Sequence, residues 1–372
     1  MTRVLHIVDG SCDETGLQCL GALRARLVSD GQSHAVCCLD PAGLSRARRV
    51  LGQDVASAPR RVSRFFNYAP DLDRIAKCAQ VGLVHAWGAD SAVAASARLA
   101  EIPKVLTVLS PVDARRVAGW VRAISESTVV ATGSQVVRAR LVSAGVTPDK
   151  IVVIRGPADF AAVNRARQSD LRRSLVGDSR CVILLDGPAS RAGGQYYGLW
   201  AAAIVSEVLH DLRVMMPYES AESRRLLRFV RQIGRKDMVI VPDPSHSWPQ
   251  LAACADVFCC PAVEDICTES IAAAMAAGAV VVGSAVRSVA ELIADRHNGL
   301  LCKPAEPRTL AGKLLNALED GELRRRLANV ARGQAYEVFG VRAFADNYAT
   351  LYENVLAGRP ASEGIADTAM VA

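Results

Sequence analysis

Features that mark secreted, membrane-spanning or nucleic-acid-binding proteins are scarce in this sequence. No stretch of the 372 residues reaches about 18 uninterrupted apolar residues, and the apolar run near the amino terminus, Val4–Val8, is too short for a signal peptide. There are only six lysines, and the 38 arginines lack the clustered basic faces and interleaved aromatics of a nucleic-acid-binding protein. We therefore expect a cytoplasmic protein that does not bind nucleic acid.

The eleven cysteines and six histidines show no spacing typical of a disulfide framework or a metal site. No C-x-x-C motif occurs, and the only adjacent cysteines are Cys37-Cys38 and Cys259-Cys260. The histidines have no metal-ligand spacing among themselves or with the cysteines. We interpret the cysteines as small buried side chains in a reducing compartment and His85 as a core or cleft-wall histidine rather than a catalytic one, and we expect neither metal nor cofactor.

Half of the residues are hydrophobic, and short apolar runs alternate with amphipathic stretches of about 10 to 16 residues, as in parallel-sheet proteins. Apart from a run that starts at Cys181, the expected strands are Val4–Val8, Ala35–Leu39, Gly82–Ala86, Val105–Leu109, Thr128–Ala131, Ile151–Ile154, Leu212–Met216, Met238–Val241, Val257–Cys260, Ala279–Gly283 and Gly299–Leu301. Long helices are expected at Pro307–Glu319, Glu322–Tyr336 and Val341–Leu356. The sequence thus predicts an α/β protein with two doubly wound parallel sheets.

The pattern of strands and helices lapses in a polar segment between Pro157 and Arg180, which we interpret as a domain junction. We expect a first domain over residues 1–165, a second over 166–340, a helix over 341–357 and a mobile tail over 358–372. Two such sheets leave a cleft at the carboxyl ends of their strands, where open α/β sheets bind ligands. The net charge of +6 suits a ligand that carries phosphate groups.

Several segments resemble the retaining nucleotide-sugar glycosyltransferases of family 4, also known as glycosyl transferases group 1. In the second half they are Ala255–Pro261, Glu264-Asp265, Ala274–Val282, Val289–Ile293 and Asn298–Leu301 with Pro304. In the first half they are Val84–Ala86, Ile102–Val108, Val136–Leu141, Gly145–Ile154 and Asp159, while Gly340–Tyr352 is similar to the closing helix that returns to the first domain. The resemblance implies the GT-B fold, with an acceptor-side Rossmann-like domain, a nucleotide-sugar donor domain and a cleft between them.

The catalytic motif of this family, a Glu followed after seven residues by a second Glu before Ala-Met-Ala, is altered here. Aligned on Met275, its first place holds Asp265 and its second holds Ala273. The resemblance implies that Asp265 lies near the donor sugar, while the carboxylate that clasps the donor ribose is absent. Glu269 or Glu291 would then hold donor hydroxyls, although a solvated helix residue is the alternative interpretation of Glu269.

The phosphate-binding segment is altered as well, since Pro188 and Gly193 stand where the family has two cations. A departing nucleoside diphosphate needs positive charge to stabilise its bridging oxygen. The residues that would bind it, by side chain or by the amides of a helix that begins here, are Ser190, Arg191, Gly193, Gly194 and Arg287. A plain turn before a helix is the alternative interpretation of the two glycines.

In the first domain, Thr107-Val108-Leu109 stands where the family has a histidine that touches the reacting sugar. Gly16 is one of two family glycines that let the backbone approach the sugar diphosphate, so it would admit the donor from this side. A basic run with two phenylalanines is interpreted either as a solvated charged face or as a surface for anionic lipid. It consists of Arg46, Arg48, Arg49, Arg60, Arg61, Arg64 and Phe65-Phe66.

Together these residues favour a metal-independent glycosyltransferase that moves a sugar from a nucleotide-sugar donor to a saccharide, lipid or small-molecule acceptor with retention. Peripheral contact with the inner face of the membrane is part of this interpretation. The alternative is a catalytically inactive GT-B scaffold that serves as a binding or partner subunit, because three altered positions are what a loss of catalysis would produce. A nucleotide-sugar epimerase on the same fold is a third interpretation, for which no acid–base residues can be named.

Overall fold

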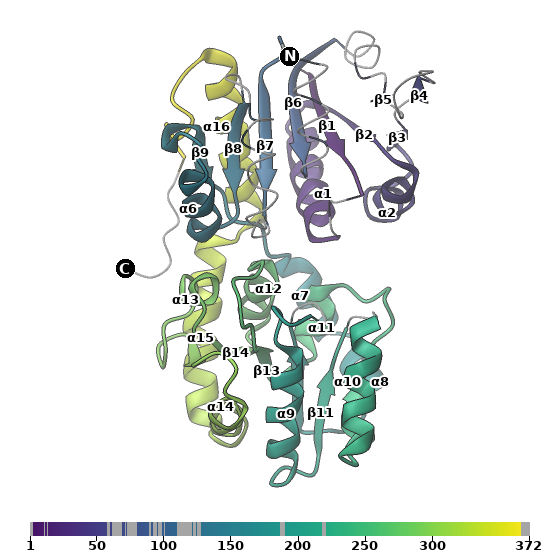
Figure 1. Ribbon diagram of the computed structural model, residues 1–372, viewed down its shortest axis with the longest axis vertical. Helices are drawn as coiled ribbons and strands as arrows, with labels where there is room; N and C mark the ends of the chain where they lie inside the picture. The colour runs from purple at the N-terminus through teal and green to yellow at the C-terminus, as the bar shows by residue number, and fades with distance from the viewer. Residues whose placement is uncertain are drawn as a thin grey trace. The chain divides into compact units, whose positions relative to one another are not determined.

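The computed structural model describes residues 3–10, 12, 14–57, 60–61, 69–70, 72, 80–88, 91, 95, 99, 101–109, 121, 124, 128–186, 190–217 and 221–365. It divides into two compact units (Figure 1). Unit 1 contains the chain up to Pro157 and again from Val341, and unit 2 contains Ala158–Gly340. Each unit has its own sheet and its own core, and each is described by itself.

Unit 1 is built on a parallel sheet with the strand order β3-β2-β1-β6-β7-β8-β9. Its strands are β1 (Arg3–Val8), β2 (Ser33–Cys38), β3 (Ala56–Ser57), β6 (Val81–Trp87), β7 (Lys104–Val108), β8 (Thr128–Thr132) and β9 (Ile151–Val153). The short strands β4 (Arg60–Arg61) and β5 (Ala69–Pro70) form a separate antiparallel pair. The helices described in this unit are α1 (Glu14–Ser29), α2 (Pro41–Leu51), α6 (Gln135–Ser143) and α16 (Val341–Ala357).

Unit 2 is built on a parallel sheet with the strand order β12-β11-β10-β13-β14-β15. Its strands are β10 (Cys181–Leu185), β11 (Leu212–Met215), β12 (Val239–Ile240), β13 (Val257–Cys260), β14 (Val280–Ser284) and β15 (Gly299–Cys302). Its helices are α7 (Phe160–Arg167), α8 (Leu171–Val176), α9 (Gln195–Ser206), α10 (Ala221–Gln232), α11 (Trp248–Ala253), α12 (Glu269–Ala277), α13 (Arg287–Ala290), α14 (Pro307–Glu319) and α15 (Gly321–Val338). Apolar side chains fill both faces of this sheet, one under α7, α11 and α12 and the other under α9, α10 and α14.

The predicted α/β fold with two doubly wound parallel sheets is confirmed. Strand β13 and helix α14 have the bounds that the sequence predicts, because the strand is a fully buried apolar run and Pro307 opens the helix. The expected strand Met238–Val241 shortens to Val239–Ile240, since Met238 closes a 3-10 turn that begins at Lys236.

The two units meet in the sequence at Pro157–Ala158, whereas the sequence pattern places the border at residue 165. The Ala158 amide donates to the Phe339 carbonyl at 2.8 Å, and Asp159 caps α7 by accepting from the Ala162 amide at 2.8 Å. These bonds hold the first turns of α7 within unit 2. The polar composition of residues 157–180 does not reveal this border, because the polar residues belong to the exposed faces of α7 and α8.

Helix α16 is tied to the sheet of unit 1 by buried hydroxyl and imidazole groups. His85 shares hydrogen bonds of 2.7 Å with the Tyr352 hydroxyl and with Thr107 Oγ1, which in turn lies 2.7 Å from the Tyr348 hydroxyl. His85 is fully buried and its polar atoms are satisfied, as its interpretation as a core histidine predicts. Thr107 therefore stabilises the packing of α16 on strands β6 and β7.

Two further histidines lie in the same buried layer. His6 Nε2 is 2.9 Å from His34 Nδ1, and Trp87 Nε1 donates to His6 Nδ1 at 3.2 Å. Burial keeps these rings neutral: it lowers the pKa of His34 to about 4 and holds the pKa values of His6 and His85 well below the usual range. We call His6, His34 and His85 the histidine cluster.

Candidate donor site

The predicted site residues of unit 2 follow the carboxyl ends of three neighbouring strands. Residues 190–194 follow β10, residues 261–269 follow β13, and residues 287–291 follow β14. Strand β10 pairs with β11 on one side and with β13 on the other, so the strand order reverses between β10 and β13. Open α/β sheets bind ligands at the carboxyl ends of their strands at such a switch point. The geometry of unit 2 therefore brings these segments together.

The turn before α9 depends on Gly194. This residue has φ of +68° and ends a turn in which the Gly193 amide donates to Ser190 Oγ at 3.1 Å and the Gly194 amide donates to the Ser190 carbonyl at 3.2 Å. The predicted Gly193 and Gly194 amides are thus engaged within the turn. The amides of the next two residues, Gln195 and Tyr196, open α9 and point in the direction of its amino terminus.

We predict that Gly194→Ala destabilises the protein by about 2 to 4 kcal/mol, because left-handed backbone and a steric clash act together. A Cβ atom at this position would lie 1.9 Å from the Pro261 carbonyl oxygen. Gly234→Ala is the matched control, since φ is +73° there but no atom lies within 4 Å of an added Cβ. Urea unfolding of both variants measures the difference, and equal losses would contradict the role of the Pro261 contact.

The turn at 190–194 is joined to the segment that leads to Asp265. The Ala192 carbonyl accepts hydrogen bonds from the Val263 amide at 2.8 Å and from the Glu264 amide at 3.3 Å. Arg191 directly precedes Ala192 and is exposed, and within the described residues its side chain makes no hydrogen bond or ion pair. Its guanidinium is therefore available to an anion at this edge of the sheet.

Asp265 is held by the start of α13. Its side chain is only 6% exposed, accepts from the Ser288 amide at 2.9 Å and forms an ion pair of 2.9 Å with Arg287, whose side chain is 70% exposed. Ser288 Oγ in turn accepts from the Ile266 amide at 3.0 Å. The predicted residues Asp265 and Arg287 thus form one unit, in which the carboxylate orients a guanidinium that remains open to solvent. Ser288 was missed by sequence reasoning, because nothing in its local pattern distinguishes it.

Glu269 is the first residue of α12, where a carboxylate is favoured by the helix dipole. It is buried, and Cys267 Sγ donates a hydrogen bond to it. Ala273 lies one turn later on the same helix and is also buried. Glu291 directly follows α13 and is half-buried. The interpretation of Glu269 as a solvated helix residue is wrong, since its side chain lies inside the protein.

Gly16 belongs to unit 1, in the first turn of α1, which follows β1 and its loop. That loop is fixed by two carboxylates: Asp9 accepts from the Ser91 amide at 2.6 Å and Asp40 accepts from the Gly10 amide at 2.6 Å. The meeting of Gly16 with the residues of unit 2 stays a prediction.

The basic run, interpreted from the sequence as a surface for solvent or for lipid, is described in part. Arg46 donates to the Cys12 carbonyl and Arg48 to the Val55 carbonyl, and residues 62–68 lie outside the described part of the chain.

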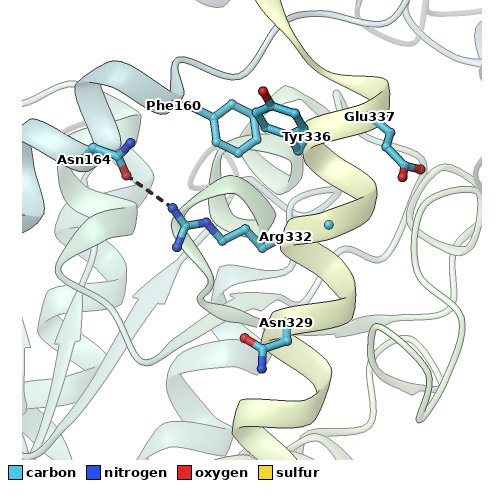
Figure 2. A pocket seen from close by; sticks show the side chains of 7 residues that line it. Phe160, Asn164, Asn329, Arg332, Tyr336 and Glu337 are labelled. Atoms are coloured by element: carbon cyan, nitrogen blue, oxygen red, sulfur yellow. Dashed lines mark hydrogen bonds between the residues drawn. The ribbon is translucent and has the colours of Figure 1, made fainter.

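A cavity of about 440 Å³ lies elsewhere in unit 2, between α7 and α15 (Figure 2). Arg332 Nη2 donates to Asn164 Oδ1 at 3.3 Å, and the rings of Phe160 and Tyr336 meet edge to face with centroids 5.6 Å apart. None of the predicted site residues lines it. Among the described residues, no cluster of histidine, cysteine and acidic side chains could hold a metal ion, and no helix is long and apolar enough to cross a membrane.

Known proteins resemble this chain in both units. A model of glycosyltransferase family 4 matches residues 19–161, and a model of glycosyl transferases group 1 matches residues 201–334. N-acetyl-alpha-D-glucosaminyl L-malate synthase of Bacillus anthracis is 26% identical over 42% of this chain, and alpha-D-kanosaminyltransferase of Streptomyces kanamyceticus is 24% identical over 52%. The chain spans 40% and 51% of the lengths of these two relatives.

Solved structures agree over almost the whole chain. HepE from Anabaena in complex with UDP-glucose matches 95% of this chain and 100% of its own with a TM-score of 0.81 and 17% identity. Sucrose-phosphate synthase from Thermosynechococcus elongatus matches 96% of this chain and 100% of its own with a TM-score of 0.76 and 17% identity. The fold is thus GT-B. With each unit matched by the corresponding family model, the chain belongs to the family 4, group 1 glycosyltransferases.

Proposed function

We propose that this protein transfers a sugar from a nucleotide-sugar donor to a saccharide, lipid or small-molecule acceptor, with retention at the anomeric carbon. The observation that carries the proposal is the convergence of the loops after β10, β13 and β14 at the switch point of the unit 2 sheet. This edge presents the exposed guanidinium groups of Arg191 and Arg287. Two cations suit the two phosphates of a nucleoside diphosphate.

The proposed chemistry divides the roles by charge. Arg191, Arg287, Ser190 and the amides at the start of α9 bind the diphosphate and stabilise the negative charge that develops as it leaves. Asp265 lies next to the donor sugar and orients the Arg287 guanidinium through their ion pair. Glu269 and Glu291 accept hydrogen bonds from donor hydroxyls, and Gly16 lets the backbone of unit 1 approach the donor.

Three similar proteins support the choice of donor and of stereochemistry. The Anabaena neighbour was solved with UDP-glucose, which makes UDP-glucose the first donor to test. Both curated relatives are named for alpha-linked sugars, and an alpha product from an alpha-linked nucleotide sugar requires retention. The N-acetyl-alpha-D-glucosaminyl L-malate synthase supports a small-molecule acceptor, alongside saccharides and lipids. For a lipid acceptor, contact with the inner face of a membrane would be an advantage.

A catalytically inactive scaffold is the second candidate function. It is favoured by Ala273, which leaves the ribose without the family's carboxylate, and by the engagement of Asp265 with Ser288 and Arg287. Such a protein could bind a nucleotide or a partner subunit and catalyse nothing. Nucleotide binding and sugar transfer must therefore be measured separately.

We expect UDP-glucose or UDP to stabilise the full chain by about 2.7 kcal/mol at a hundred times the dissociation constant. A thermal-shift series with UDP-glucose, UDP, GDP-sugars and ADP-sugars measures this, with free glucose as the control. Release of nucleoside diphosphate with an acceptor panel, and the anomeric coupling of the product by NMR, then test transfer and retention. Binding without release in any acceptor mixture would favour the scaffold, and a beta-linked product would overturn retention.

A further inference from the structure

Unit 2 carries exposed apolar side chains on and directly after two neighbouring helices. Of the eight large hydrophobic side chains that are exposed within the described residues, five lie on or directly after α9 and α10. They are Tyr196, Trp200, Ile204, Val208 and Ile233. Trp200 is 43% exposed, although burial of an indole is strongly favourable. We call these five residues the α9 strip.

The α9 strip is a continuous surface. Tyr196, Trp200, Ile204 and Val208 recur every four residues, so they line up along one side of α9 and of the turn that follows it. The rings of Tyr196 and Trp200 have centroids 5.8 Å apart, and Tyr196 lies 5.0 Å from the ring of Phe229 on α10. A groove of about 380 Å³ runs between the two helices. Solvent exposure of several neighbouring large apolar side chains indicates a binding partner.

Helix α10 adds positive charge to the same side of the unit. Both helices pack on one face of the sheet, α9 through Leu199 and Val205 and α10 through Leu226 and Val230, so their solvent sides face the same way (Figure 1). Three exposed positions of α10, turned away from the buried Leu226 and Val230, are arginines. These are Arg224, Arg228 and Arg231.

These three arginines are available to an external anion. The neighbouring Arg225 and Arg235 form ion pairs with Glu222 and Glu207, respectively. Arg224, Arg228 and Arg231 make no ion pair or hydrogen bond with any residue that the structure describes. The surface thus combines an interfacial tryptophan and tyrosine, aliphatic side chains and three uncompensated guanidinium groups.

We propose that the α9 strip and Arg224, Arg228 and Arg231 dock unit 2 on an anionic lipid surface. Tryptophan, tyrosine and aliphatic side chains on one surface suit insertion at the boundary between headgroups and acyl chains, while arginines of the neighbouring helix pair with lipid phosphates. Charge disfavours a second copy of this chain as the occupant, because a two-fold contact through the same surface would bring both sets of arginines together. The proposed donor site shares only the backbone amide of Tyr196 with this surface, and the variants below leave Tyr196 unchanged, so vesicle binding and sugar transfer can fail independently.

Flotation of the full chain with vesicles tests the proposal. Vesicles of phosphatidylcholine with about 30% phosphatidylglycerol should carry the protein, and pure phosphatidylcholine vesicles should carry much less. The triple variant Arg224→Gln, Arg228→Gln, Arg231→Gln should lower the partition coefficient roughly a hundredfold, since each arginine near an anionic surface contributes about fivefold. The double variant Trp200→Ser, Ile204→Ser should lower it at least about tenfold.

Two control variants make matched changes at positions away from the α9 strip and the three arginines of α10. The triple variant Arg165→Gln, Arg325→Gln, Arg359→Gln removes the same charge from exposed positions on α7, on α15 and just after α16, and Tyr336→Ser removes another exposed aromatic. Both should bind vesicles as the unaltered protein does, and circular dichroism should show all variants folded. The proposal is overturned if the unaltered protein does not float with anionic vesicles or if the controls lose as much binding. It is also overturned if Trp200→Ser, Ile204→Ser converts a dimer to a monomer in sedimentation equilibrium without changing vesicle binding.

Discussion

Replacing Arg191 with alanine is expected to lower turnover about a hundred- to a thousandfold and to leave the fold intact. Removal of one preorganised group that stabilises developing charge typically costs about 3 to 4 kcal/mol in the transition state. Arg191 is exposed and, among the described residues, makes no contact that supports the core, so its loss should not change the free energy of unfolding by more than about 0.5 kcal/mol. Release of UDP from UDP-glucose measures the rate.

Two companion variants make this result specific to the site. Arg325→Ala removes an exposed arginine from α15 and should leave turnover unchanged. Arg191→Lys keeps the charge without the planar guanidinium and should recover part of the activity. If Arg191→Ala and the unaltered protein release UDP at the same rate, Arg191 does not bind the diphosphate. If neither releases UDP but both bind it equally well, the scaffold interpretation takes the place of the transferase.

The fold could be predicted from the sequence because parallel sheets have a strong local signature. Their strands are buried on both faces and read as apolar runs, as in Val257–Cys260, and each is followed by a helix with its own periodicity. The donor-site residues could be placed at strand ends by the same reasoning. The convergence of residues 190–194, Asp265 and Arg287 depends on which strands are neighbours in the sheet. That strand order is set by the crossover connections, which local sequence patterns do not reveal.

Contacts between distant segments account for what the sequence did not predict. Glu269 is buried and accepts a hydrogen bond from Cys267, although an acidic residue at a helix start suggests solvent. Ser288 matters because a strand and a loop bring it next to Asp265. The same applies to the histidine cluster: His6 and His85 are partners in the register of β1 and β6, yet they stand 79 positions apart in the sequence.

The histidine cluster should make the protein acid-sensitive at a pH where most proteins are stable. His6, His34 and His85 are neutral in the folded state, whereas their unfolded pKa is about 6.5. Below pH 6.5 the unfolded chain therefore binds protons that the folded protein does not, and the free energy of unfolding falls as the pH falls. For His34 this loss ends near its folded pKa of about 4, and for His6 and His85 it continues further.

Each buried neutral histidine contributes a slope of up to about 1.4 kcal/mol per pH unit, so three of them reach about 4 kcal/mol per unit between pH 6 and pH 5. Aspartate and glutamate titrate mainly below pH 5, so the change in the free energy of unfolding between pH 6 and pH 5 comes mainly from the histidines.

Urea unfolding at pH 8, 7, 6 and 5 measures the slope. His34→Gln can keep a hydrogen bond to His6 and should reduce the slope by about a third, because one of three silent titrations is removed. His297→Gln, at an exposed loop position, should not change it. A free energy of unfolding that is flat from pH 7 to pH 5 in the unaltered protein would mean that these rings are protonated in the folded state. In that case burial does not keep them neutral, and the anchoring of α16 through His85 does not depend on pH.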